Sequence, residues 1–138
     1  MAWDLENLNP SQRKYWDAEQ TEWVDFRLVP DEEMQKIRKG LGLKSKQKYI
    51  PNTLTKRMDA VIDVDGSDDT MMKFNDAIIC YQIEDWNLLT KSGELISCTD
   101  ENKLKMFYGS PVFARWANKC LSELQKDLEE IEEEERKN

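Results

Sequence analysis

The chain has 138 residues and a formal net charge of -8, with 39% hydrophobic and 35% charged residues. A chain of this length buries about two-thirds of its unfolded surface, which predicts one ordinary domain that folds without disulfides. An acidic surface repels phosphate, so the charge argues against nucleic-acid binding, with the basic stretch 36–48 as a local exception. No apolar run reaches the ~20 residues that span a bilayer. The start of the chain also lacks the features of a signal peptide, so we expect a cytoplasmic protein without membrane association.

The residue types that most chemistry needs are missing or scattered. Cys80, Cys98 and Cys120 are odd in number and form no CxxC pair, which argues against a disulfide framework and against a zinc site. The chain has no histidine, the commonest general base and transition-metal ligand. The acidic residues lie in runs typical of exposed faces, and the glycines form no phosphate-binding motif. We therefore expect no catalysis, no metal and no cofactor.

One acidic stretch, residues 63–69, looks like a calcium-binding loop around Gly66. Aligning Gly66 with the sixth position of such a loop leaves Val61 at the first position and Met72 at the twelfth. Two essential carboxylates are then absent, so the sequence favours a solvated turn.

The first half of the chain predicts short elements. Asn9 followed by Pro10 indicates a short helix start. Residues 22–29 alternate as in a half-buried strand, and a bulge is expected because Trp23 and Phe26 cannot share one face of a regular strand. The next elements are a helix over 31–39, a connector over 40–56 with one extended piece at 48–50, and a second strand over 58–64.

The second half predicts longer helices. Residues 70–86 form a helix that is apolar on most sides, and residues 87–97 form a loop or hairpin. Thr99 caps a helix that reaches residue 108. The last helix runs from Pro111 to about residue 130 and carries one apolar stripe, consisting of Phe113, Ala117, Cys120, Leu124, Leu128 and Ile131.

These elements predict a mostly α-helical α+β fold: a small antiparallel sheet packed on about four helices, with a long acidic C-terminal helix. We assign residues 1–21 to an N-terminal leader with a short helix, residues 22–128 to a single globular domain, and residues 129–138 to an acidic tail.

The remaining kind of functional site is a surface that binds a partner protein. We expect Trp86 and Trp116 to be buried, whereas Trp3 lies in a polar leader and could equally anchor a partner. The apolar stripe of the last helix outlasts the expected core, although a solvated helix end would explain its charges as well. The candidate partner-binding residues are Trp3, Leu124, Leu128, Glu129, Glu130, Ile131 and Glu132.

Several motifs between residues 22 and 138 resemble one known family. A strand at 23–29 precedes a Pro-Asp-Glu-Glu helix start, followed by IxDWxxL at 83–89, a Lys-Ser-Gly-Glu turn, SCTDENK at 97–103, and a Pro-x-Phe helix that ends in a glutamate tail. This order is similar to that of tail assembly chaperones of long-tailed bacteriophages and prophages.

The resemblance implies a protein of the bacterial host cytoplasm that binds the tape measure protein and keeps it soluble while the tail tube assembles. It allows the tail tube protein as a second partner and implies no catalysis. The sequence leaves open whether the chain forms a homo-oligomer. Two other readings remain: an acidic inhibitor that mimics DNA to block a nuclease or restriction enzyme, and a structural head or tail component.

Overall fold

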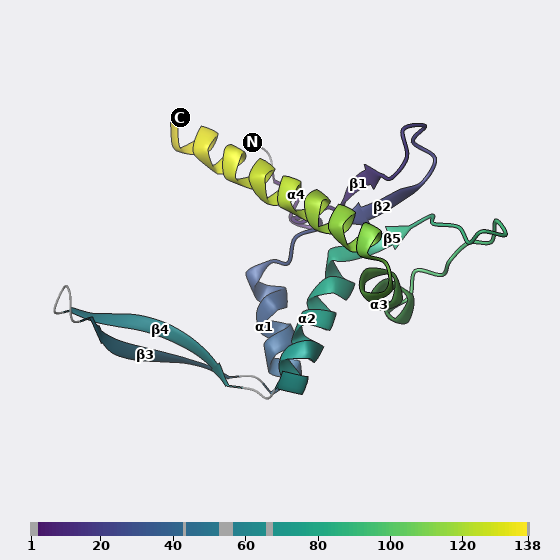
Figure 1. Cartoon of the computed structure of the whole chain (residues 1–138). Coiled ribbons are helices and arrows are strands. Elements are labelled where there is room, and N and C mark those ends of the chain that lie inside the picture. Colours follow the sequence, from purple (N-terminus) through teal and green to yellow (C-terminus); the bar gives the residue numbers. More distant parts are fainter. Residues whose placement is uncertain (1–2, 43, 53–56, 66–67, 138) are drawn as a thin grey trace. The chain divides into compact units, whose positions relative to one another are not determined.

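The structure, a computed structural model, describes residues 3–42, 44–52, 57–65 and 68–137, and within them the side chains of residues 3–42 and 69–136. These residues form four helices, a three-stranded sheet and a pair of strands (Figure 1), which confirms the predicted mostly helical α+β class. The chain divides into two compact units, Met1–Pro30 with Ile79–Asn138 (unit 1) and Asp31–Ile78 (unit 2). The domain predicted over 22–128 and the tail over 129–138 stay predictions.

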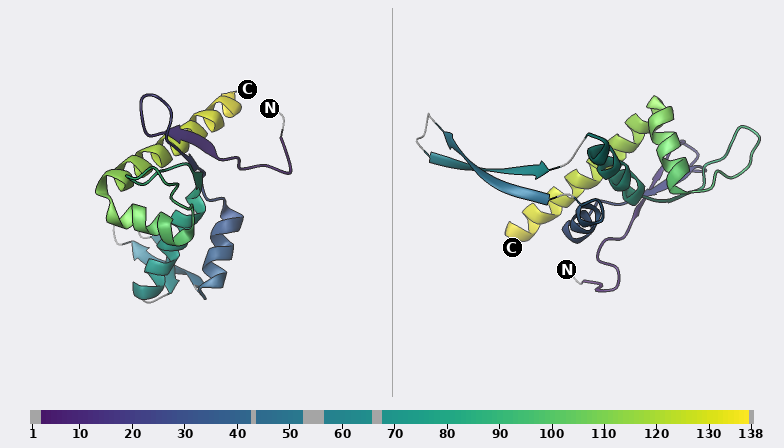
Figure 2. Two further views of the ribbon diagram at one scale, coloured as in Figure 1. Left: turned by 90° about the vertical axis from the view of Figure 1, so that its right-hand side faces the viewer. Right: turned by 90° about the horizontal axis from the view of Figure 1, so that it is seen from below.

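Unit 1 is built on an antiparallel sheet in the order β1-β2-β5, formed by Gln12–Tyr15, Trp23–Phe26 and Ile83–Trp86. Successive residues of a strand point to opposite faces, so Val24 and Phe26 share one face, and both are fully buried. Helix α4, Pro111–Lys137, supplies the other side of this core (Figure 2). The core cluster consists of Val24, Phe26, Ile83, Trp86, Leu88, Phe113, Ala117, Cys120 and Leu124.

The helix predicted after Asn9 is wrong, because this segment forms strand β1 instead. The side chain of Asn9 donates a hydrogen bond to the carbonyl of Leu28 at 2.8 Å rather than capping a helix. Strand β1 covers one edge of β2, and Arg13 forms two hydrogen bonds to Asp25 across the pair, at 2.9 and 3.2 Å. Pairing the exposed edge of β2 outweighs the local helix signal.

The end of the predicted 70–86 helix is also wrong. Helix α2, Asp68–Gln82, stops four residues early, and β5 pairs with β2. The guanidinium of Arg27 donates to the carbonyl of Tyr81 at 2.7 Å, and the amide of Arg27 donates to the carbonyl of Gln82 at 2.9 Å. These bonds satisfy carbonyls that a continuing helix would have used. The bulge predicted in β2 lies in its partner instead: β2 pairs regularly with β1, and against β5 the partner of Asp25 is Asp85 and that of Phe26 is Ile83, so the extra residue is in β5.

The remaining elements of unit 1 follow the sequence closely. Residues 87–97 form a loop closed by a bridge between Leu89 and Leu95. Helix α3, Asp100–Gly109, begins at the predicted cap, where the Thr99 side chain accepts a hydrogen bond from the amide of Asn102. Helix α4 begins at Pro111 as expected but continues to Lys137, beyond the predicted end near residue 130.

Unit 2 contains helix α1, Asp31–Gly40, the antiparallel strands β3, Lys44–Asn52, and β4, Arg57–Asp65, and the first part of α2. The predicted helix over 31–39 and strand over 58–64 are confirmed. The extended piece predicted at 48–50 is confirmed, but the rest of the connector predicted over 40–56 is wrong where β3 is longer: residues 44–52 form a strand whose register pairs Lys44 with Asp65 and Lys46 with Asp63. Of the stretch that looked like a calcium loop, Gly66 and Ser67 lie outside the described residues.

Candidate partner-binding surfaces

The apolar stripe of α4 changes character halfway along the helix. Phe113, Ala117 and Cys120 are buried against the sheet, and Leu124 is only 4% exposed. One and two turns further on, Leu128 and Ile131 are each 42% exposed. The stripe therefore continues past the core with the same spacing but without the same cover.

A shallow groove, the α4 groove, lies where the stripe leaves the core. It has a volume of about 140 Å³. The leader and the two residues that follow β2 form one wall, and α4 forms the other; Figures 1 and 2 show the leader on the side of the C-terminal half of α4. The groove is lined by Asn9, Pro10, Gln12, Arg27, Leu28, Leu124, Leu128 and Ile131.

Two polar contacts hold the walls of the α4 groove. The hydrogen bond from Asn9 to the carbonyl of Leu28 fixes the leader beside the chain that leaves β2. The ammonium of Lys14 on β1 lies 3.4 Å from the carboxylate of Glu123 on α4, one residue before Leu124. The groove is thus assembled from segments that are far apart in the sequence.

The predicted site residues are only partly brought together. Leu124, Leu128 and Ile131 share the α4 groove, although Leu124 belongs mainly to the core. Glu129, Glu130 and Glu132 are exposed on the same stretch of α4 and surround the stripe with negative charge. Trp3 is 68% exposed in the leader and does not line the groove. Of the two tryptophans predicted to be buried, Trp86 is buried and Trp116 is half-buried against the core.

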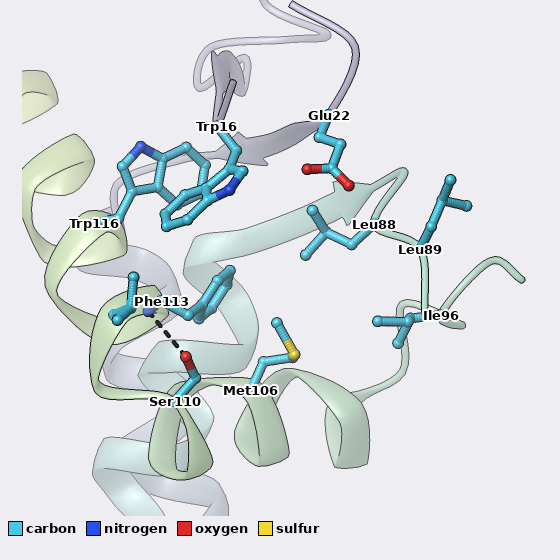
Figure 3. A pocket seen from close by; sticks show the side chains of 10 residues that line it. Trp16, Glu22, Leu88, Leu89, Ile96, Met106, Ser110, Phe113 and Trp116 are labelled. Carbon is cyan, nitrogen blue, oxygen red and sulfur yellow. Dashed lines mark hydrogen bonds between the residues drawn. The ribbon is translucent and has the colours of Figure 1, made fainter. Parts of the chain in front are cut away.

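A second pocket, the tryptophan pocket, was not anticipated from the sequence. It has a volume of about 210 Å³ and shares no lining residue with the α4 groove. Figure 3 shows the Trp16 and Trp116 rings together on one side, the Phe113 ring near the middle and the Glu22 carboxylate at the rim. It is lined by Trp16, Glu22, Leu88, Leu89, Ile96, Met106, Ser110, Val112, Phe113 and Trp116.

The walls of the tryptophan pocket are fixed by specific contacts. The rings of Trp16 and Trp116 meet edge to face with centroids 5.1 Å apart. The indole of Trp86 donates to the carbonyl of Ile96 at 2.7 Å, which secures the 87–97 loop. The hydroxyl of Ser110 accepts a hydrogen bond from the amide of Phe113 at 3.2 Å (Figure 3), at the junction of α3 and α4.

The turn between β1 and β2 positions Glu22 at the rim. The Asp17 carboxylate accepts hydrogen bonds from the Thr21 hydroxyl and from the amides of Thr21 and Glu22. These bonds, led by the Thr21 hydroxyl, lower the pKa of Asp17 below its ordinary value. The amide of Trp16 donates to the carbonyl of Glu22 at 2.8 Å, so the backbone of Glu22 is held from both sides.

Two of the three cysteines have thiols of raised pKa. Cys120 is buried in the core, and the Cys80 thiol donates a hydrogen bond to the carbonyl of Asp100 at 3.8 Å. Burial raises the pKa of Cys120 to about 11 and also raises the pKa of Cys98. A raised pKa keeps these thiols protonated and poorly nucleophilic at neutral pH. Among the residues that the structure describes, no group of three or more His, Cys, Asp or Glu side chains is placed to hold a metal ion.

No protein-family model, curated protein or solved structure matches this chain. Within the part of the chain that the structure describes, no helix is both long and apolar enough to cross a membrane.

Proposed function

We propose that this protein is a non-catalytic assembly chaperone that binds an apolar, basic segment of a client protein through the α4 groove. The client is the tape measure protein of a long-tailed phage or prophage, and the tail tube protein is a second partner. The identity of the client rests on the family resemblance of residues 22–138. The mode of binding rests on the physical character of α4.

The observation that carries the proposal is the uncovered continuation of the α4 stripe. Leu128 and Ile131 keep the spacing of the core residues but remain 42% exposed. Exposed apolar side chains gathered in a groove and rimmed by polar residues are typical of protein interaction sites. A helical client with apolar residues three or four apart would bury these two side chains as the core buries Leu124.

The charge around the stripe sets the chemistry of the client. Between residues 123 and 135, Lys126 is the only basic residue, and the rest of the charged positions are acidic. Among the described side chains, Glu129, Glu130 and Glu132 form no ion pair with a lysine or arginine. A basic client would be attracted to this surface, whereas nucleic acid would be repelled. Excess negative charge would also keep the complex dispersed.

The test is co-expression in bacterial cytoplasm of this chain with the tape measure protein of the same genome, with the soluble fraction of the tape measure protein as the readout. We expect the unmodified chain to form a soluble complex with the tape measure protein. The double variant Leu128→Lys/Ile131→Lys should lose the complex, because it places two positive charges in the apolar part of the α4 groove. The matched control is Leu95→Lys, which changes an exposed leucine outside both pockets.

Each outcome decides a separate point. If the folded, unmodified chain leaves the tape measure protein insoluble and uncomplexed, the chaperone function is wrong, and the DNA-mimic and virion-component readings become the ones to test. If the double variant retains the complex as well as Leu95→Lys does, the α4 groove is not the client site.

A further inference from the structure

The tryptophan pocket is independent of the α4 groove and requires its own explanation. Eight of its lining residues carry apolar side chains, contributed by the turn after β1, the 87–97 loop, α3 and α4. Leu89 and Val112 at its edge are exposed, which extends the apolar surface out of the pocket. An apolar pocket with an apolar rim favours a ligand that buries a bulky apolar group.

Two of the residues that line the pocket, Ser110 and Glu22, have hydrophilic side chains. The Ser110 hydroxyl already accepts a hydrogen bond from the amide of Phe113. Glu22, in contrast, points its carboxylate toward the pocket (Figure 3) and forms no ion pair with a lysine or arginine among the described side chains. Its backbone is held by Asp17 and Trp16, so the carboxylate is presented from a fixed turn. This arrangement favours a cation beside the apolar group.

The size of the pocket suits one large side chain. An apolar cavity of roughly 150 Å³ is enough to hold a benzene molecule. At about 210 Å³, the tryptophan pocket has room for a leucine, methionine or phenylalanine side chain. A small polar metabolite would need several converging polar groups to orient it, and this pocket presents a single free carboxylate. Phosphate-bearing ligands would be repelled by that carboxylate.

We propose that the tryptophan pocket is a second protein-docking site, which takes a bulky apolar side chain of a partner whose neighbouring lysine or arginine pairs with Glu22. The apolar side chain packs against Trp16, Phe113 and Met106, and the partner's cation reaches the rim. Aromatic pockets that bury one anchor side chain are common centres of protein recognition. This site does not depend on the α4 groove or on the identity of the client there, so either can fail alone.

The tryptophans allow a direct test. The full chain labelled with 5-fluorotryptophan gives one ¹⁹F signal for each of Trp3, Trp16, Trp23, Trp86 and Trp116, assigned by single Trp→Phe substitutions. The probe is a short alanine-rich helical peptide with one leucine and a lysine four residues later. Two control peptides replace the leucine by alanine or the lysine by glutamate.

The proposal predicts that the leucine-lysine peptide shifts the signals of Trp16 and Trp116 at about millimolar concentration, as expected for a single anchor side chain. The signals of Trp3 and Trp23, which do not line the pocket, should stay in place. The alanine control should not shift the pocket signals. Replacing lysine by glutamate should weaken binding about threefold or more, in the range of a partly exposed charge pair.

Glu22→Gln should abolish the preference for lysine over glutamate while retaining the dependence on leucine. The matched control is Glu94→Gln, which changes an exposed glutamate outside the pocket and should leave the preference intact. The proposal is overturned if the pocket signals do not move, if Trp3 and Trp23 move equally, if the alanine control binds as well, or if Glu22→Gln keeps the lysine preference.

Discussion

The two halves of α4 carry one apolar stripe but have different surroundings. From Phe113 to Leu124 the stripe lies against Val24, Phe26 and the rest of the core. From Leu128 to Ile131 it has the leader and Leu28 beside it and is 42% exposed at both positions. Helical spacing therefore predicts which face of a helix is apolar. Whether that face is core or exposed surface depends on what the rest of the chain places over it.

A matched pair of substitutions, Leu124→Ala and Leu128→Ala, tests whether the two halves of α4 differ in burial. They remove the same atoms one turn apart on the same helix face. Leu124→Ala should lower the free energy of unfolding by about 2–5 kcal/mol because it leaves a cavity in the core. Leu128→Ala should cost about 1 kcal/mol, because its side chain is only partly buried. Urea denaturation measures both, and equal losses would show that the core continues past Leu124.

A second prediction concerns the thiol of Cys120, in the covered half of α4. Its pKa of about 11 lies above the ordinary value of 9.0, so the thiolate fraction near pH 8 falls roughly 100-fold relative to the unfolded chain. Alkylation of Cys120, followed by mass spectrometry, should slow by at least that factor on folding, because burial also keeps the reagent from the sulfur. The chain unfolded in urea is the control, and similar rates in both states would contradict burial of this half.

The raised pKa of Cys120 also predicts how the free energy of unfolding changes with pH. Below pH 9 the thiol is protonated in both states, and the full stabilisation of the neutral thiol is present. Between pH 9 and about 11 the folded state binds more protons than the unfolded state, so stability falls as the pH rises. Cys120→Ala should flatten the fall over that interval, and an unchanged profile would show that Cys120 does not cause it.

The smallest expected effect lies at the junction of the two halves, where Lys14 pairs with Glu123 at 3.4 Å. Both side chains are partly exposed, so a double-mutant cycle with Lys14→Ala and Glu123→Ala should give a coupling of about 0.2–1 kcal/mol. The coupling should shrink in high salt. A coupling indistinguishable from zero at low salt would mean that this pair does not hold β1 against α4.

Much of the fold follows from local signals in the sequence. The cap at Thr99 and the break at Ser110 and Pro111 both depend on residues near one another in the chain. Strands β1 and β5 were missed because each has only four residues and is defined by pairing with β2. Ile83 and Trp86, three residues apart, fit a helix face as well as a bulged strand.

The two candidate sites also differ in whether local sequence signals predict them. The apolar spacing of α4 alone identified Leu128 and Ile131. The tryptophan pocket could not be found that way, because Trp16, Leu88, Met106 and Phe113 come from separate segments that only the tertiary fold brings together. The one available signal was the number of tryptophans, five in 138 residues, which exceeds what the small core absorbs.

The most direct test of the account is truncation after Gln125, with two readouts on the same protein: the free energy of unfolding and the capture of soluble tape measure protein. The truncated chain keeps Leu124 and the covered half of α4 but loses Leu128, Ile131 and the glutamates around them. The account predicts a stability within about 2 kcal/mol of the full chain and loss of client capture. A large loss of stability, or full retention of client capture, would contradict it.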